Sequence, residues 1–188
     1  MVKNILSIVL VLTLFGCADV QIDNNCQFVD SEEICLGSST LPNNIANKFE
    51  AVKDKTLLNK ALGSPQKGAL CQGQVYKSKK GSKIILYRAW NSTNPRSKLG
   101  QWWAFNKPLG EISKYRSDYE ICYQWSPLDK LVRCTLKDDI KVVVGTGQSA
   151  ECSEYLTYPV SDKQQIYIDD PANSLIDCTI FSGEFNWK

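Results

Sequence analysis

Apolar residues between positions 44 and 62 recur at roughly the three- to four-residue spacing of an amphipathic helix. They are Ile45, Phe49, Val52, Leu62 and either Leu57 or Leu58. Asn43 or Asn44 can cap the first turn, and Gly63 is a residue type at which helices end. We therefore predict one N-terminal helix from about residue 44 to residue 62.

From Gln74 onward the pattern changes to short apolar runs, many of them rich in β-branched residues and separated by Gly, Pro, Asn and Asp. The predicted strands cover residues 74–78, 83–90, 100–105, 115–125, 130–136, 140–145, 164–168 and 177–182. No second long helix and no internal repeat is apparent in the sequence. This pattern predicts a β-rich α+β domain, with one helix packed on bent or split antiparallel sheets.

Within the first sixteen residues, Lys3 is followed by an apolar run that is too short to span a membrane. The run ends on Gly16-Cys17, which resembles a bacterial lipobox, although Phe15 is larger than the residue usual at that position. We predict a lipoprotein signal peptide over 1–16, a lipidated anchor and linker over 17–42, and a globular domain over 43–188. The alternative is an ordinary secretory signal cut nearby, and both predict an exported protein.

Seven cysteines remain besides Cys17, which fits three disulfides and one free thiol in an oxidising compartment. Cys122 and Cys134 lie on two predicted strands joined by residues 126–130. A hairpin centred on Leu128 would place them opposite each other, so we predict a disulfide between them. Cys26 and Cys35 close a short loop and form the second predicted pair.

Composition excludes several kinds of chemistry. The chain has no histidine, so Ser-His-Asp and Cys-His catalysis are excluded, and without Cys-x-x-Cys spacing no metal site is expected. The formal net charge is only +2, with no basic stripe that would predict binding to nucleic acid. The glycine-rich stretch 145–150 lacks a following helix, so we interpret it as a structural turn rather than a phosphate loop.

The remaining candidates for chemistry are polar and aromatic residues on predicted strands. Arg88 lies near the end of the strand 83–90, beside Tyr87, and Trp102-Trp103 should place their rings on opposite faces of the next strand. A guanidinium can form paired hydrogen bonds to phosphate oxygens, and an indole can stack on a flat ring. This combination suits a phosphorylated ligand that contains a ring.

The order of these residues resembles that of the tuberculosis-necrotizing-toxin type of NAD glycohydrolase, and more broadly the ADP-ribosyltransferase-like fold. The features that carry the resemblance, over residues 84–168, are Arg88, the stretch Gly100-Gln101-Trp102-Trp103-Ala104 followed by Pro108, Arg116, and Gln164-Gln165 at the start of a late strand. The chain departs from the family in its insert 91–96 and in lacking the histidine found beside the nucleotide.

The resemblance implies a role for each matched position. Arg88 would be the first arginine in contact with NAD and Arg116 the second. Trp102 or Trp103 would stack on the dinucleotide, with Tyr87 a further binding candidate, and Gln164 or Gln165 would lie near the scissile ribose. NAD would be the substrate, with no cofactor required. The late strand lacks the Glu-x-Glu or Gln-x-Glu spacing of arginine-modifying transferase toxins, which favours hydrolysis over transfer.

Two hypotheses follow from the sequence. The first is an exported, lipid-anchored enzyme that hydrolyses NAD. The second is a non-catalytic, disulfide-stabilised lipoprotein whose aromatic residues bind a protein, as an exclusion, adhesion or inhibitor module would; a toxin could likewise have an immunity protein as its partner. They differ in geometry, because the enzyme requires Arg88, one of the two tryptophans and Gln164 or Gln165 to meet at one cleft.

Overall fold

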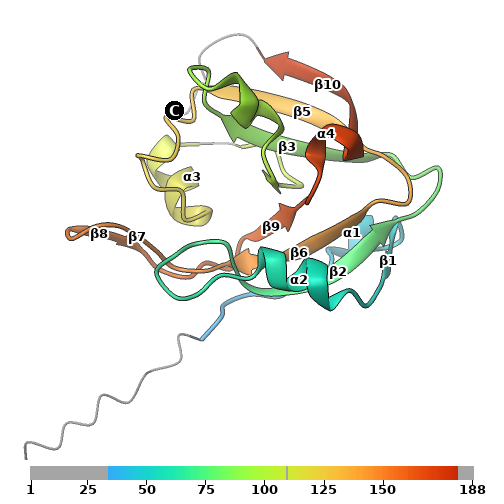
Figure 1. Ribbon diagram of the computed structural model, residues 1–188, viewed down its shortest axis with the longest axis horizontal. Coiled ribbons are helices and arrows are strands. Elements are labelled where there is room, and N and C mark those ends of the chain that lie inside the picture. Colours follow the sequence, from blue (N-terminus) through green and yellow to red (C-terminus); the bar gives the residue numbers. More distant parts are fainter. Residues whose placement is uncertain (1–33, 109, 182–188) are drawn as a thin grey trace, which may run out of the picture. The chain divides into compact units, whose positions relative to one another are not determined.

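The computed structural model describes residues 34–108 and 110–181, which form a β-rich, mixed α/β structure with antiparallel sheets (Figure 1). The first sheet has the strand order β1 (Phe49–Ala51), β2 (Leu70–Ser78), β6 (Lys141–Gly147), β9 (Gln164–Tyr167) and β4 (Trp102–Trp103). The second has the order β10 (Leu175–Phe181), β5 (Lys130–Leu136) and β3 (Ile84–Trp90). Strands β7 (Ala150–Ser153) and β8 (Leu156–Tyr158) form a separate hairpin. The helices are α1 (Asn43–Ala46), α2 (Lys55–Ala61), α3 (Ile112–Asp118), α4 (Pro171–Ser174) and the 3-10 helix η1 (Pro95–Leu99).

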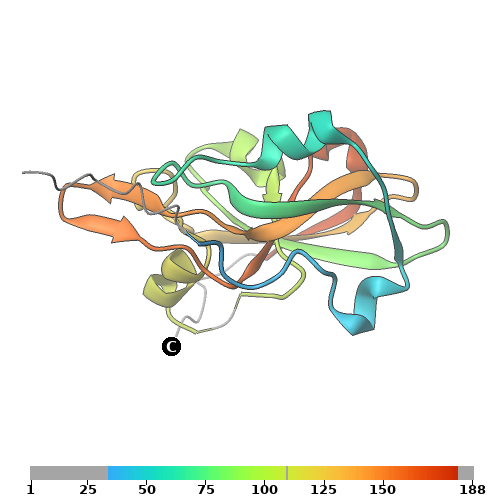
Figure 2. The same ribbon diagram turned by 90° about the horizontal axis from the view of Figure 1, so that it is seen from below.

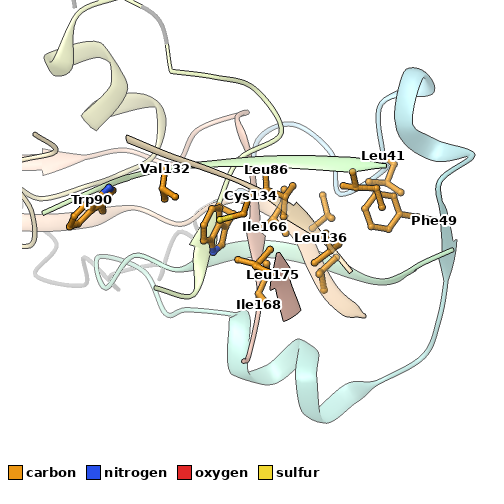
Figure 3. Close-up of a cluster of buried hydrophobic side chains, with 14 residues drawn as sticks. Leu41, Phe49, Leu86, Trp90, Val132, Cys134, Leu136, Ile166, Ile168 and Leu175 are labelled. Atoms are coloured by element: carbon orange, nitrogen blue, oxygen red, sulfur yellow. The ribbon is translucent and has the colours of Figure 1, made fainter. Parts of the chain in front are cut away.

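The main core lies between the two larger sheets (Figure 3). Alternate residues of the buried strands point into it, such as Leu86 on β3, Val144 on β6 and Ile166 on β9. The opposite face of the five-stranded sheet carries Val143 and Val75, which α2 covers with Leu57 and Ala61. Because β6 is buried on both faces, it is a continuous apolar run rather than an alternating one.

The predicted helix over residues 44–62 is wrong, because that segment forms α1, β1 and α2 in succession. Phe49 enters the core between the sheets, and its strand pairs with β2 at Ser78. Leu57 packs instead on the outer face of the sheet, in a helix whose first turn is capped by the Asp54 carboxylate. Figure 2 shows α1 and α2 as separate helices. The apolar residues therefore serve two different cores, although their combined spacing resembles that of one helix.

The predicted strand over residues 115–125 is also wrong. Residues 112–118 form α3, and the apolar side chains of Ile112, Tyr115 and Tyr119 recur at helical spacing and pack in one cluster. The strand predicted over 100–105 shortens to β4, and the glycine-rich stretch predicted as a turn lies in β6 as far as Gly147. The helix and the loop that follows it lie against β3, where Leu128 contacts the same cluster.

Three disulfides within the described part of the chain stabilise the fold and indicate an oxidising, exported environment. They join Cys35 to Cys71, Cys122 to Cys152 and Cys134 to Cys178. Both predicted pairs are therefore wrong. Cys122 lies in the loop after α3 and not on a strand, so no hairpin brings it to Cys134. Cys134 lies on β5, where it pairs with Leu86 of β3. Cys35 is bonded elsewhere, and its predicted partner Cys26 lies outside the described residues.

Part of the predicted linker belongs to the folded structure. Leu41 is buried in the main core, and Cys35 is bonded to β2 through Cys71. The predicted signal peptide and the lipidation site Cys17 lie outside the described residues. Across residues 34–108 and 110–181, no helix is long and apolar enough to cross a membrane.

The disulfide between Cys134 and Cys178 closes a long loop between adjacent strands, so we expect the double substitution Cys134→Ala/Cys178→Ala to lower the free energy of unfolding by about 2–4 kcal/mol. Urea denaturation of the oxidised protein measures this loss. Cys26→Ser is the matched control, because it removes a thiol but none of the three disulfides, and it should leave the unfolding midpoint unchanged. Non-reducing peptide mapping that recovered a Cys122–Cys134 peptide would contradict the assignment.

Candidate functional site

A cavity of about 180 Å³ lies beside the ends of β3, β4 and β9, where α3 and the loop after it cover them. Its walls combine one arginine, several aromatic rings, one amide and one carboxyl group. These side chains are Arg88 on β3, Trp102 and Trp103 on β4, Gln165 on β9, Tyr115 on α3, and Tyr119, Glu120 and Trp125 after α3. Segments far apart in the sequence thus contribute to one hollow.

The guanidinium of Arg88 is held rigidly in the cavity wall. Its Nε donates to the carbonyl oxygen of Ser97 at 2.8 Å, and its Nη1 donates to that of Trp102 at 2.7 Å. A Cβ at position 100 would overlap Nη2, so Gly100 is the residue that leaves room for the guanidinium. Burial lowers the pKa of Arg88 to about 10, which still leaves it cationic at neutral pH.

Arg88 forms no salt bridge with a carboxylate among the described residues. Two of its three nitrogens serve the main chain, so the arginine has a structural role in joining β3 to η1 and β4. Its positive charge is not neutralised by these bonds. The cavity is therefore suited to a ligand that brings a negative group, such as a phosphate.

The two tryptophans occupy different environments. Trp103 is buried in the main core, and its indole Nε1 donates to the carbonyl oxygen of Gly100 at 2.7 Å. Trp102 is half-buried and packs on Tyr167, with ring centroids 5.1 Å apart and an interplanar angle of 60°. Both residues contribute to the lining of the cavity, although their rings pack in different clusters.

The structure separates the two glutamines that the sequence left as alternatives. Gln165 is buried and lines the cavity, where its Nε2 donates to Oε2 of Glu120 at 2.7 Å. Gln164 does not line it, and its Nε2 donates to the carbonyl oxygens of Ser38 and Thr40 at 2.8 and 2.6 Å. Neighbouring residues on a strand point to opposite faces, and of these two it is Gln165 that lines the cavity.

Arg116 and Tyr87 are not brought to the cavity. The guanidinium of Arg116 donates to the carbonyl oxygens of Ile121 and Ser126 at 3.2 and 2.7 Å, and it braces the loop after α3. Tyr87 exchanges two backbone hydrogen bonds of 2.9 Å with Ala104, which ties β3 to the end of β4. In this structure both residues support the walls of the cavity rather than form them.

Sequence reasoning missed Glu120. Its side chain is buried, and burial raises its pKa to about 8. The hydrogen bond from Gln165 acts in the opposite direction but is outweighed. In the sequence this glutamate stands between Tyr119 and Ile121 within a predicted strand, with no signal that its carboxyl is buried.

The aromatic residues Tyr119 and Trp125 were also missed as members of the site. Tyr115 and Tyr119 lie one helical turn apart, with ring centroids 4.6 Å apart. Burial raises the pKa of Tyr119 to about 12, so its hydroxyl stays neutral at physiological pH. The site therefore combines aromatic rings with a cation on β3 and an amide–carboxyl pair.

No group of three or more Cys, His, Asp or Glu side chains within the described part of the chain is placed to hold a metal ion. No protein-family model, no curated protein and no solved structure matches the chain. The cavity itself is therefore the basis for inferring a function.

Proposed function

We propose that the protein hydrolyses NAD at the bond between nicotinamide and ribose, with an ADP-ribosyltransferase-like arrangement of its sheets. The observation that carries the proposal is the meeting of Arg88, Trp102, Trp103 and Gln165 at one cavity. This is the convergence that the enzyme hypothesis requires, and Gln165 is the glutamine that fulfils it. The alternative glutamine, Gln164, holds a neighbouring segment instead.

The size of the cavity indicates which part of the substrate it would hold. At about 180 Å³ it is smaller than the roughly 300–1,000 Å³ of pockets that enclose a whole ligand. It suits the nicotinamide ring and its ribose, bounded by aromatic side chains. The pyrophosphate would lie toward Arg88, whose charge has no carboxylate partner in the described residues.

Breaking this bond requires positioning more than proton donation. The leaving nicotinamide already carries a positive charge, and it departs as a neutral molecule while the ribose passes through an oxocarbenium-like state. Arg88 would fix the pyrophosphate and a tryptophan would fix the ring. The amide of Gln165 would lie beside the ribose, where positive charge develops.

We further propose that the protein is an exported lipoprotein anchored through Cys17. The disulfides require oxidising conditions. The short apolar run that ends at Gly16-Cys17 supplies the signal for lipidation. An anchored enzyme of this kind would act on NAD outside the cytoplasm, or on NAD in a neighbouring cell as a toxin does.

We expect the purified, disulfide-bonded protein to release nicotinamide from NAD, measured by chromatography of the products. Arg88→Ala should mainly raise KM, because the pyrophosphate carries the same charge in the ground and transition states. Arg88→Lys keeps the charge but loses the paired hydrogen bonds, and it should recover only part of the affinity. Wild-type protein that releases no nicotinamide, with no rise in melting temperature at millimolar NAD, would contradict the proposal.

A second candidate function is a non-catalytic binding module. Three aromatic residues close in sequence to the Cys122–Cys152 disulfide are exposed: Tyr123 by 58%, Trp125 by 52% and Tyr155 by 88%. Tyr155 lies in the turn of the β7–β8 hairpin, which projects from the sheets in Figure 1. Exposed aromatic residues are common in protein interfaces. This function would be favoured if the wild-type protein neither cleaves nor binds NAD.

A further inference from the structure

Glu120 occupies a backbone position that ordinarily belongs to glycine. The N–H of Ile121 donates to the carbonyl oxygen of Arg116 at 2.9 Å, which closes the end of α3. The residue before Ile121 must then adopt a left-handed conformation, and Glu120 has φ +47°. A residue with a Cβ is disfavoured there, so the glutamate is not explained by the needs of the helix end.

The carboxyl group of Glu120 is also unfavourably placed for stability. The residue is only 2% exposed, and its Oε1 is buried without a hydrogen-bond partner among the described residues. Both of its carboxyl oxygens lie close to Gly147, where a Cβ would overlap them. An unpaired buried acceptor costs about 1–3 kcal/mol, so the stability of the fold does not account for a carboxyl group at this position.

The groups around the carboxyl leave it able to exchange a proton near neutrality. Gln165 donates to Oε2. The Ser161 hydroxyl donates to the carbonyl oxygen of Asp118 at 2.7 Å and lies near enough to the carboxyl group to lower its pKa, whereas the charge of Asp118 disfavours ionisation. Tyr119 lies beside it and is neutral. Among the described residues no cation contributes to its titration, so burial dominates and raises the pKa to about 8. A base functions best when its pKa is close to the working pH.

A purely structural role does not require a carboxyl at this position. Glutamine would accept the same hydrogen bond from Gln165, and glycine would suit the backbone better. Backbone strain and buried unpaired groups persist at functional sites, where they serve the chemistry. Strain, burial and an unpaired oxygen thus coincide in one residue that lines the cavity and holds Gln165.

We propose that Glu120 is the general base of this cavity, with Oε1 accepting a proton from the attacking water while Oε2 holds the amide of Gln165. The inference rests on the proposed NAD hydrolysis. The water oxygen forms a bond to C1′ of the ribose, and the bond from C1′ to the nicotinamide nitrogen breaks. The bonding electron pair neutralises the nicotinamide, and the proton of the water passes to the Glu120 carboxylate. Solvent later removes that proton.

The test compares wild-type protein with Glu120→Gln for NAD hydrolysis between pH 5 and pH 9.5, with kcat and KM measured separately. Wild-type kcat/KM should rise with pH, with a midpoint near 8, because the carboxylate is the active form in the free enzyme. Glu120→Gln keeps the contact to Gln165 but cannot accept the proton. Its kcat should fall by about a hundredfold or more with KM little changed, and its kcat/KM should lose this pH dependence.

The outcomes separate this inference from the function on which it rests. If wild-type protein releases no nicotinamide, both proposals fail. If wild-type protein is active and Glu120→Gln keeps its kcat and its pH profile, only the role of Glu120 is overturned. Glu120→Gly guards against misfolding, because it relieves the left-handed conformation. It should still unfold in one cooperative thermal transition and lose kcat to a similar extent, and full activity in this variant would also overturn the proposal.

Discussion

Gln165→Ala is expected to lower kcat for NAD hydrolysis by roughly ten- to a thousandfold, the effect of losing one oriented hydrogen bond at a centre where charge develops. Gln165 lines the cavity, and its amide is oriented by the hydrogen bond to Glu120. The interaction strengthens as the ribose becomes positive, so it favours the transition state over bound NAD. The loss should therefore fall on kcat rather than on KM.

The adjacent residue provides a matched control for this variant. Gln164→Ala removes the same side chain from the neighbouring position of β9, and it should leave kcat unchanged. It should lower the melting temperature instead, because its amide holds the carbonyl oxygens of Ser38 and Thr40. Steady-state kinetics with thermal melting distinguishes the two variants. Equal losses of kcat in both would contradict the assignment of Gln165 to the site.

The strands of the sheets were the most predictable part of the fold. Residues 83–90, 130–136 and 140–145 were predicted within one or two residues of β3, β5 and β6. These segments are buried and β-branched, and their local pattern agrees with their place in the sheets. For the same reason Arg88 could be assigned to a strand end, and the structure places it in the cavity wall.

Pairing between distant segments was not predictable. The disulfide between Cys134 and Cys178 depends on β10 lying beside β5, which is a feature of sheet order. The short β1 depends in the same way on its partner β2. Local spacing carries no record of such contacts, so the shortest loop between cysteines and one continuous helix were the natural but incorrect predictions.

Only the site residues that lie on strands could be predicted from the sequence. Arg88, Trp102 and Gln165 lie on strands, where the pattern is strong. Glu120 and Trp125 lie after α3, within residues predicted as a strand. Glu120 takes the place of a C-terminal glycine, so the usual signal for a helix end is absent. A glycine at this position would have indicated the end of the helix in the sequence, and a glutamate does not.

The pH dependence of stability gives a test of Glu120 that needs no activity. Burial raises its pKa from 4.5 to about 8, so between these values the folded protein holds a proton that the unfolded chain releases. The contribution of this residue to stability is therefore lost progressively as pH rises from about 4.5 to 8 and is constant above that.

The variant Glu120→Gln has no such proton. Its free energy of unfolding relative to wild type should rise between pH 4.5 and pH 8 by on the order of 4 kcal/mol, since each pKa unit corresponds to about 1.4 kcal/mol. Urea denaturation at pH 4.5, 6 and 8 with the disulfides intact measures the difference, and Glu154→Gln, at an exposed glutamate, is the control. Parallel stability profiles for wild type and Glu120→Gln would show that the carboxyl ionises normally in the folded protein, and would remove the basis for its role as a base near neutral pH.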